Sequence, residues 1–115
     1  METETDMRKL KGAVSHHDAE VAELRQDREL AVAYLKAALE TLDDPNQLAG
    51  ALLALRTVAE AHGGLRAVAA EAGITRESLY RALSPKGNPT LRTLLAVIRT
   101  VGLRLSVEAG EEAAA

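Results

Sequence analysis

The chain has 115 residues, a formal net charge of −3, no cysteine, and two tyrosines as its only aromatic side chains. This length fits one small domain with terminal tails, and the lack of cysteine excludes a disulfide framework, a zinc ribbon and a thiol nucleophile. The core must consist of Leu, Val, Ile and Ala, a composition that favours helices. Because the chain has neither a bilayer-spanning apolar run nor an apolar signal region at its start, we expect a cytoplasmic protein.

The net charge conceals an asymmetry along the chain. Residues 1–61 carry seven basic and twelve acidic side chains, a net charge of −5. Residues 62–107 carry seven basic and two acidic side chains, a net charge of +5, and residues 108–115 add three glutamates. A weakly acidic protein can bind DNA when its positive charge lies on one face, although ordinary scatter along a chain also produces an excess of this size.

The first 26 residues form an N-terminal extension that is partly disordered by prediction. Residues 1–14 are charged without an apolar period, which is typical of disorder. Residues 15–26 can form a short helix whose few apolar contacts come from Val21 and Leu24. The adjacent His16 and His17 have no third ligand at a helical spacing, so solvated surface histidines explain them better than a metal site.

Two amphipathic helices follow the extension. Asp27 is the expected N-cap of a helix over residues 28–41. The D-P-N-Q sequence at residues 44–47 is a capping-box arrangement with Asp44 as the N-cap, and it starts a helix that ends near Ala61. The apolar stripes of these helices are Leu30, Tyr34, Leu35, Ala38, Leu39, Thr41 and Leu42, and then Leu48, Leu52, Leu55 and Ala59.

Short helices over residues 65–72 and 76–83 have the pattern of a helix-turn-helix, the unit that places its second helix in a DNA major groove. Gly73 stands where the first helix must stop and the chain must turn, and glycine reaches positive φ without steric cost. Thr75 is the expected cap of the second helix, and Leu79 then points back at the first helix.

The last helix follows a turn over residues 84–89. Asn88 is its expected cap and Pro89 its first residue, and it extends to about Val101. Its expected buried residues are Leu91, Leu94, Leu95 and Ile98.

Residues 103–107 alternate apolar and polar side chains, which predicts a β-strand. A single strand in a helical chain leaves both edges unpaired, so antiparallel pairing with a second copy predicts a homodimer; an extended tail laid over the core is the alternative. Residues 108–115 are an expected disordered tail. The dimer strand would present Leu103, Leu105 and Val107.

The candidate base-reading residues lie on the exposed side of the second helix of the motif and at its two ends. Arginine can make a bidentate contact to guanine, and glutamate can accept a hydrogen bond from cytosine. The alternative is that Glu77 and Arg81, four residues apart, pair with each other on a solvated face, and both interpretations can hold together. The candidates are Arg76, Glu77, Tyr80, Arg81 and Ser84.

The candidate phosphate contacts surround these residues, mostly near helix starts, where free N–H groups and the helix dipole favour an anion. Such contacts set register and affinity without reading the base sequence. They are Arg66, Thr75, Lys86, Asn88, Thr90 and Arg92.

Nothing in the sequence points to catalysis. The chain contains no P-loop, no dinucleotide-binding glycine motif and no H-E-x-x-H motif, and nothing places its Ser, His and Asp residues together. We therefore expect no enzyme, no cofactor and no bound metal.

Four stretches carry a family resemblance: A-V-A-Y-L-K-A-A-L-E (31–40), A-E-A-H-G-G (59–64), G-I-T-R-E-S-L-Y-R-A-L-S-P-K-G-N-P-T (73–90) and G-L-R-L-S-V-E (102–108). In them the chain resembles the addiction-module antidote proteins, relatives of HigA-type antitoxins. The resemblance implies a phage-repressor-like (XRE-type) helix-turn-helix domain that dimerises. Together with the helices and the short C-terminal β-strand predicted above, the expected fold is an all-α, five-helix domain over residues 27–107.

The resemblance also implies a function. It indicates a DNA-binding antitoxin of a type II toxin–antitoxin module that neutralises a RelE/ParE-like toxin and represses its own operon. Two alternatives stay open: a stand-alone helix-turn-helix repressor without a toxin, and a protein-interaction module that has lost DNA binding. Residues 1–26 run longer than the usual start of such proteins.

Overall fold

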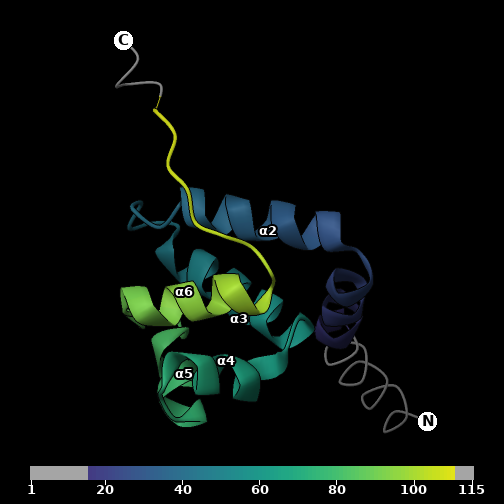
Figure 1. Ribbon diagram of the computed structural model, residues 1–115. Coiled ribbons are helices and arrows are strands. Elements are labelled where there is room, and N and C mark those ends of the chain that lie inside the picture. The colour runs from purple at the N-terminus through teal and green to yellow at the C-terminus, as the bar shows by residue number, and fades with distance from the viewer. Residues whose placement is uncertain (1–15, 111–115) are drawn as a thin grey trace, which may run out of the picture.

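The computed structural model describes residues 16–110, and the regular structure within them is entirely helical (Figure 1). The expectations for residues 1–15 and 111–115 fall outside this range. A helical stretch over residues 16–26 comes first. It is followed by α2 (Arg28–Glu40), α3 (Leu48–Ala61), α4 (Gly64–Ala72), α5 (Arg76–Ala82) and α6 (Leu91–Thr100).

The predicted all-α class fits, but the five-helix count and the C-terminal strand are wrong. Residues 16–26 supply a sixth helix, and residues 103–110 run without any strand pairing. A strand requires backbone partners on a neighbouring strand, and the described part of the chain offers none to this segment. The segment leaves α6 and passes α2 (Figure 1). Leu103 packs against the core, whereas Val107 is 95% exposed.

Several helix ends have the predicted chemistry. The Asp27 carboxylate accepts a hydrogen bond from the backbone N–H of Leu30 at 3.0 Å. The Thr75 hydroxyl accepts one from the N–H of Ser78 at 3.0 Å. Gly73 ends α4 in the left-handed region with φ of 70°, as its place in the turn requires.

Helix α3 begins at Leu48, later than the capping-box prediction. The Asp44 carboxylate accepts from the N–H of Asn46 at 2.9 Å and from the side-chain amide of Gln47 at 2.8 Å. These bonds close a turn ahead of the helix and lower the pKa of Asp44. Gln47 takes the N-cap position without a side-chain capping bond.

Helix α6 begins at Leu91, also later than predicted. Thr90, and not Asn88, supplies the cap, because its hydroxyl accepts from the N–H of Thr93 at 3.1 Å. Leu91 therefore lies at the first position of the helix, where it is 64% exposed rather than buried.

Helix α3 is the centre of the main core, with α2, α4 and α6 packed around it. Its side chains at the predicted stripe positions Leu52, Leu55 and Ala59 are fully buried. The main core cluster consists of Leu35, Ala38, Ala51, Leu52, Leu55, Ala59, Val68, Ala69, Ala72, Leu79, Leu83, Ala96, Val97 and Ile98.

The helix over residues 16–26 packs on the rest of the domain through a second apolar cluster. Val21 and Leu24 are buried there, against residues that include Val58 of α3 and Val101 at the end of α6. This helix therefore packs where α2, α3 and the end of α6 meet.

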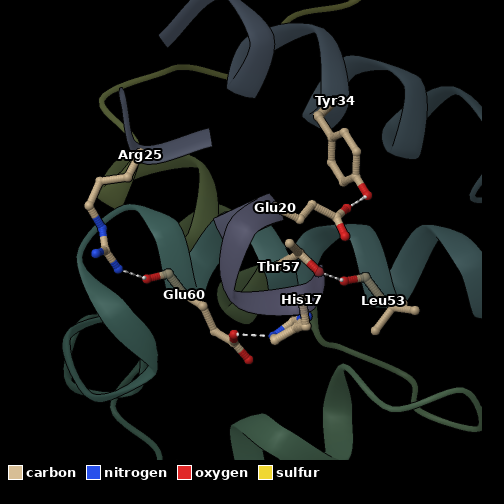
Figure 2. A network of polar contacts seen from close by, with 7 residues as sticks. All are labelled: His17, Glu20, Arg25, Tyr34, Leu53, Thr57 and Glu60. Carbon is tan, nitrogen blue, oxygen red and sulfur yellow. Dashed lines mark hydrogen bonds and ion pairs between the residues drawn. The ribbon is translucent and has the colours of Figure 1, made fainter. Parts of the chain in front are cut away.

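Polar contacts surround this second cluster (Figure 2). The His17 imidazole lies 2.8 Å from the Glu60 carboxylate, and Arg25 donates to the carbonyl of Ala61 at 3.2 Å. The Tyr34 hydroxyl donates to the Glu20 carboxylate, which raises the pKa of Tyr34 to about 12.

None of the helices within residues 16–110 has the length and apolar character needed to cross a bilayer. In the same range, no three His, Cys, Asp or Glu side chains are grouped as ligands for a metal ion.

Candidate nucleic-acid interface

Helices α4 and α5 are joined by the short turn that Gly73 begins. The N–H of Gly73 donates to the carbonyl of Ala70 at 3.1 Å, and the N–H of Ile74 donates to that of Ala69 at 3.0 Å. Leu79 on the inner face of α5 is fully buried in the core. Because this inner face is fixed, the outer face of α5 points to solvent with a defined orientation (Figure 1).

Four of the five candidate base-reading residues are exposed. Arg76, Glu77, Tyr80 and Arg81 lie on the solvent side of α5, whereas Ser84 is half-buried. The Ser84 hydroxyl donates to the carbonyl of Arg81 at 2.7 Å, so it closes the end of α5. No ion pair joins Glu77 to Arg81 in the described part of the chain.

The candidate phosphate contacts fall into two groups. Arg66, Lys86, Asn88 and Arg92 are exposed. Two threonines are already engaged in helix caps, Thr75 with Ser78 and Thr90 with Thr93.

Arg92 comes from α6 yet reaches the turn between α4 and α5. A β-carbon placed on Gly73 would lie 3.5 Å from a terminal nitrogen of the Arg92 guanidinium. The packing of α6 on α4 thus brings the first turn of α6 beside the start of α5.

The loop that carries Lys86 and Asn88 is held against the end of α5 by Gly87. The N–H of Gly87 donates to the carbonyl of Ser84 at 2.8 Å. A β-carbon on Gly87 would overlap the carbonyl oxygen of Ala82, so only glycine permits this approach.

The exposed basic side chains on and near α5 form no ion pairs with the described part of the chain. The ion pairs between residues 16 and 110 join His17 to Glu60 and Arg99 to Glu71, the latter at 3.9 Å. Neither pair uses the exposed cations of α4, α5, the loop after α5 and the first turn of α6, which are Arg66, Arg76, Arg81, Lys86 and Arg92.

A comparison with protein-family models identifies relatives of this chain. Residues 15–109 match the family model of the probable addiction module antidote proteins. The chain belongs to this family. An antidote acts against the toxin of its module, so an antitoxin role and a toxin partner follow from membership. The match also includes residues 16–26, which pack on the domain described above.

A relative of this antidote protein occurs in Haemophilus influenzae. It is an uncharacterised protein, 37% identical over 91 residues, which are 79% of this chain and 89% of the relative. No solved structure matches the antidote protein significantly.

The structure also brings to this face a residue that sequence reasoning missed. The guanidinium of Arg56, from α3 of the antidote, stacks over the ring of Tyr80 with 4.8 Å between its central carbon and the ring centroid. The available signal was that Arg56 is the single basic residue of α3. Its contact with α5 joins residues 24 positions apart, and no local sequence pattern contains it.

Proposed function

We propose that this antitoxin binds operator DNA through the outer face of α5 and represses its own operon. The observation that supports this function is the group of exposed cations around α5 that form no ion pair with any carboxylate within residues 16–110. DNA phosphates are the anions that such a face attracts. Helices α4 and α5 then act as a helix-turn-helix, and the activity is binding rather than catalysis.

The exposed side chains of α5 divide between reading bases and holding the backbone. Arg76 and Arg81 suit bidentate contacts to guanine, and Glu77 suits an amino group of cytosine. Lys86 and Arg92 on either side suit phosphates, which set the register of α5 in the groove. Thr75, Ser84 and Thr90 support this face through the helix ends that they close.

A gel-shift titration with a duplex from upstream of its own gene tests this function. Each good base contact contributes about 1–3 kcal/mol of discrimination, so the Arg76→Ala/Arg81→Ala double variant should lose roughly 100-fold or more in specific affinity. Lys36→Ala removes an exposed cation from α2, far from α5 (Figure 1), and should leave binding unchanged. Wild-type protein that shows no preference for this duplex over a scrambled one would overturn the proposal.

The toxin partner that we propose is a RelE/ParE-like protein encoded beside the antitoxin. Support comes from the charge of the other half of the molecule: residues 16–61 carry nine acidic and four basic side chains, which suits a basic partner. Co-expression of the two neighbouring genes should yield a co-purifying complex. Copurification without any specific DNA binding would instead point to an interaction module.

We also propose that the antitoxin binds DNA as a homodimer, with half-sites about 34 Å apart. The exposed side chains of Leu105 and Val107 support this proposal. Covering them with a second copy of the chain would remove apolar surface from water and so stabilise a dimer. Leu105→Glu/Val107→Glu should give a monomer by light scattering. A variant that stays dimeric would place the interface elsewhere.

A further inference from the structure

Arg56 has an unusual environment for a charged residue. Its Nε atom is buried and has no hydrogen-bond partner in the part of the chain that the structure describes. Among residues 16–110 no carboxylate forms an ion pair with its guanidinium, and its identified contact is the face of the Tyr80 ring. Tyr80 itself is exposed on α5, on the face that we assign to DNA.

Withdrawing a cation from water without an anion or a hydrogen-bond acceptor costs free energy. The stack on Tyr80 offsets part of this cost, since the electrons of an aromatic face attract a guanidinium placed over it. The stack also orients the planar guanidinium, and the partial withdrawal from water strengthens its attraction for an anion that arrives from outside.

We propose that Arg56 is a DNA phosphate contact, held in position by Tyr80. This inference rests on the function proposed above and adds a residue from α3 to the DNA face. It also gives Tyr80 a defined role. The ring orients the Arg56 guanidinium toward the DNA backbone beside α5, and a phosphate oxygen supplies the acceptor that Arg56 Nε lacks within residues 16–110. Arginine suits this position because its planar fork can both stack on a ring and donate to a phosphate.

The competing interpretation is that Arg56 only supports the Tyr80 ring. The salt dependence of binding separates the two. Each phosphate contact contributes about 0.9 to the slope of log K against log salt concentration for duplex DNA. A residue that acts only by packing changes affinity without changing this slope.

The experiment measures the affinity of the full-length protein for two duplexes, the upstream sequence and a scrambled one, over a range of salt concentrations. Arg56→Met keeps an unbranched apolar stem and removes the charged guanidinium. We expect its slope to fall by about 0.9 per bound protomer on both duplexes, with a loss of roughly tenfold in affinity at low salt. Arg56→Lys should recover most of the slope, and Tyr80→Phe, which keeps the ring, should keep the wild-type slope. Lys36→Met is the matched control and should leave the slope unchanged.

Thermal unfolding by circular dichroism confirms that each variant folds. An unchanged slope in folded Arg56→Met would overturn the phosphate contact while leaving the proposed repressor function intact. Wild-type protein without specific DNA binding would overturn the function itself. If Tyr80→Ala lowered affinity as much as Arg56→Met, and neither changed the slope, Arg56 would be a packing residue alone.

Discussion

Gly87 determines the position of one loop of the proposed DNA face because it has no side chain. Its backbone lies directly on the last carbonyls of α5, and this contact fixes the loop that presents Lys86 and Asn88. The position of this loop therefore depends on the absence of a β-carbon at residue 87.

We predict that Gly87→Ala destabilises the domain by about 1–3 kcal/mol, because the added methyl group must displace the carbonyl of Ala82. Thermal unfolding measures the loss, and DNA affinity should fall with it as the loop shifts. Gly50→Ala is the matched control: nothing lies within 4 Å of its β-position in α3, so alanine there should stabilise the helix by about 1 kcal/mol. A Gly87→Ala protein as stable as wild type would show that the loop can move aside freely.

A second residue-scale prediction concerns Tyr34. Its hydrogen bond to Glu20 raises the pKa of its phenol from the ordinary 10.0 to about 12 in the folded state. Because the folded pKa lies above the unfolded one, this contribution to stability is complete below pH 10 and is lost as the pH rises toward 12. Denaturant titrations from pH 9 to 12 should show a steeper fall for wild type than for Tyr34→Phe. Parallel curves would contradict the hydrogen bond.

The roles of several residues that contact only near neighbours in the sequence were predicted correctly. The roles of residues that contact distant parts of the chain were not. Asp27, Gly73 and Thr75 form hydrogen bonds with backbone groups within five residues of themselves. The local sequence pattern is therefore enough to predict their roles. At residues 88–90, by contrast, the prediction of Asn88 as the cap is wrong, because the Thr90 side chain caps α6. The contact of Arg56 with Tyr80 depends on how α3 crosses α5, which no short window contains.

At the scale of elements, the helix over residues 16–26 is part of the packed structure. Its apolar side is narrow, since few of its side chains are buried, and a weak stripe of this kind gives little signal in sequence. Its polar contacts with α2 and α3 supply much of what holds it (Figure 2).

We predict that Leu24→Ala lowers the free energy of unfolding by about 2–5 kcal/mol, because Leu24 is 1% exposed in the second apolar cluster. Leu53→Ala removes the same group from an exposed position on α3 and should cost about 0.5 kcal/mol or less. Chemical denaturation of both variants measures the difference. Equal losses in the free energy of unfolding for the two variants would mean that packing of the helix over residues 16–26 adds little to the stability of the domain.

The C-terminal segment shows the limit of periodicity at this scale. The alternation at residues 103–107 describes side chains only, whereas a strand exists only when neighbouring backbone accepts its hydrogen bonds. The identity of a partner strand is a property of the whole fold, and the helical packing of α2 and α6 leaves none within reach among residues 16–110.

At the scale of the molecule, the acidic and basic halves of the chain fold into different regions. The helix over residues 16–26 and α2 lie at one side of α3, while α4 and α5 lie at the other (Figure 1). The acidic and basic segments of the sequence therefore lie on different sides of the molecule. Two partners of opposite charge could bind these sides separately.

We predict that toxin and DNA bind the antitoxin at the same time. A labelled duplex bound by the antitoxin should shift further when the co-expressed toxin is added, and Arg76→Ala/Arg81→Ala should abolish the DNA complex without weakening the toxin complex. Release of DNA on addition of toxin would show that the two surfaces overlap.

The positions of the two tyrosines allow the intrinsic fluorescence of the protein to report on two separate events. The chain has no tryptophan, so its ultraviolet emission comes from Tyr34 and Tyr80 alone. Tyr34 joins the helix over residues 16–26 to α2, while Tyr80 lies on the outer face of α5. In a Tyr34→Phe protein, quenching on addition of a duplex would report on the proposed DNA face; in a Tyr80→Phe protein, a change in emission on addition of denaturant would report on undocking of the N-terminal helix. Both events can be followed in real time without attaching a dye.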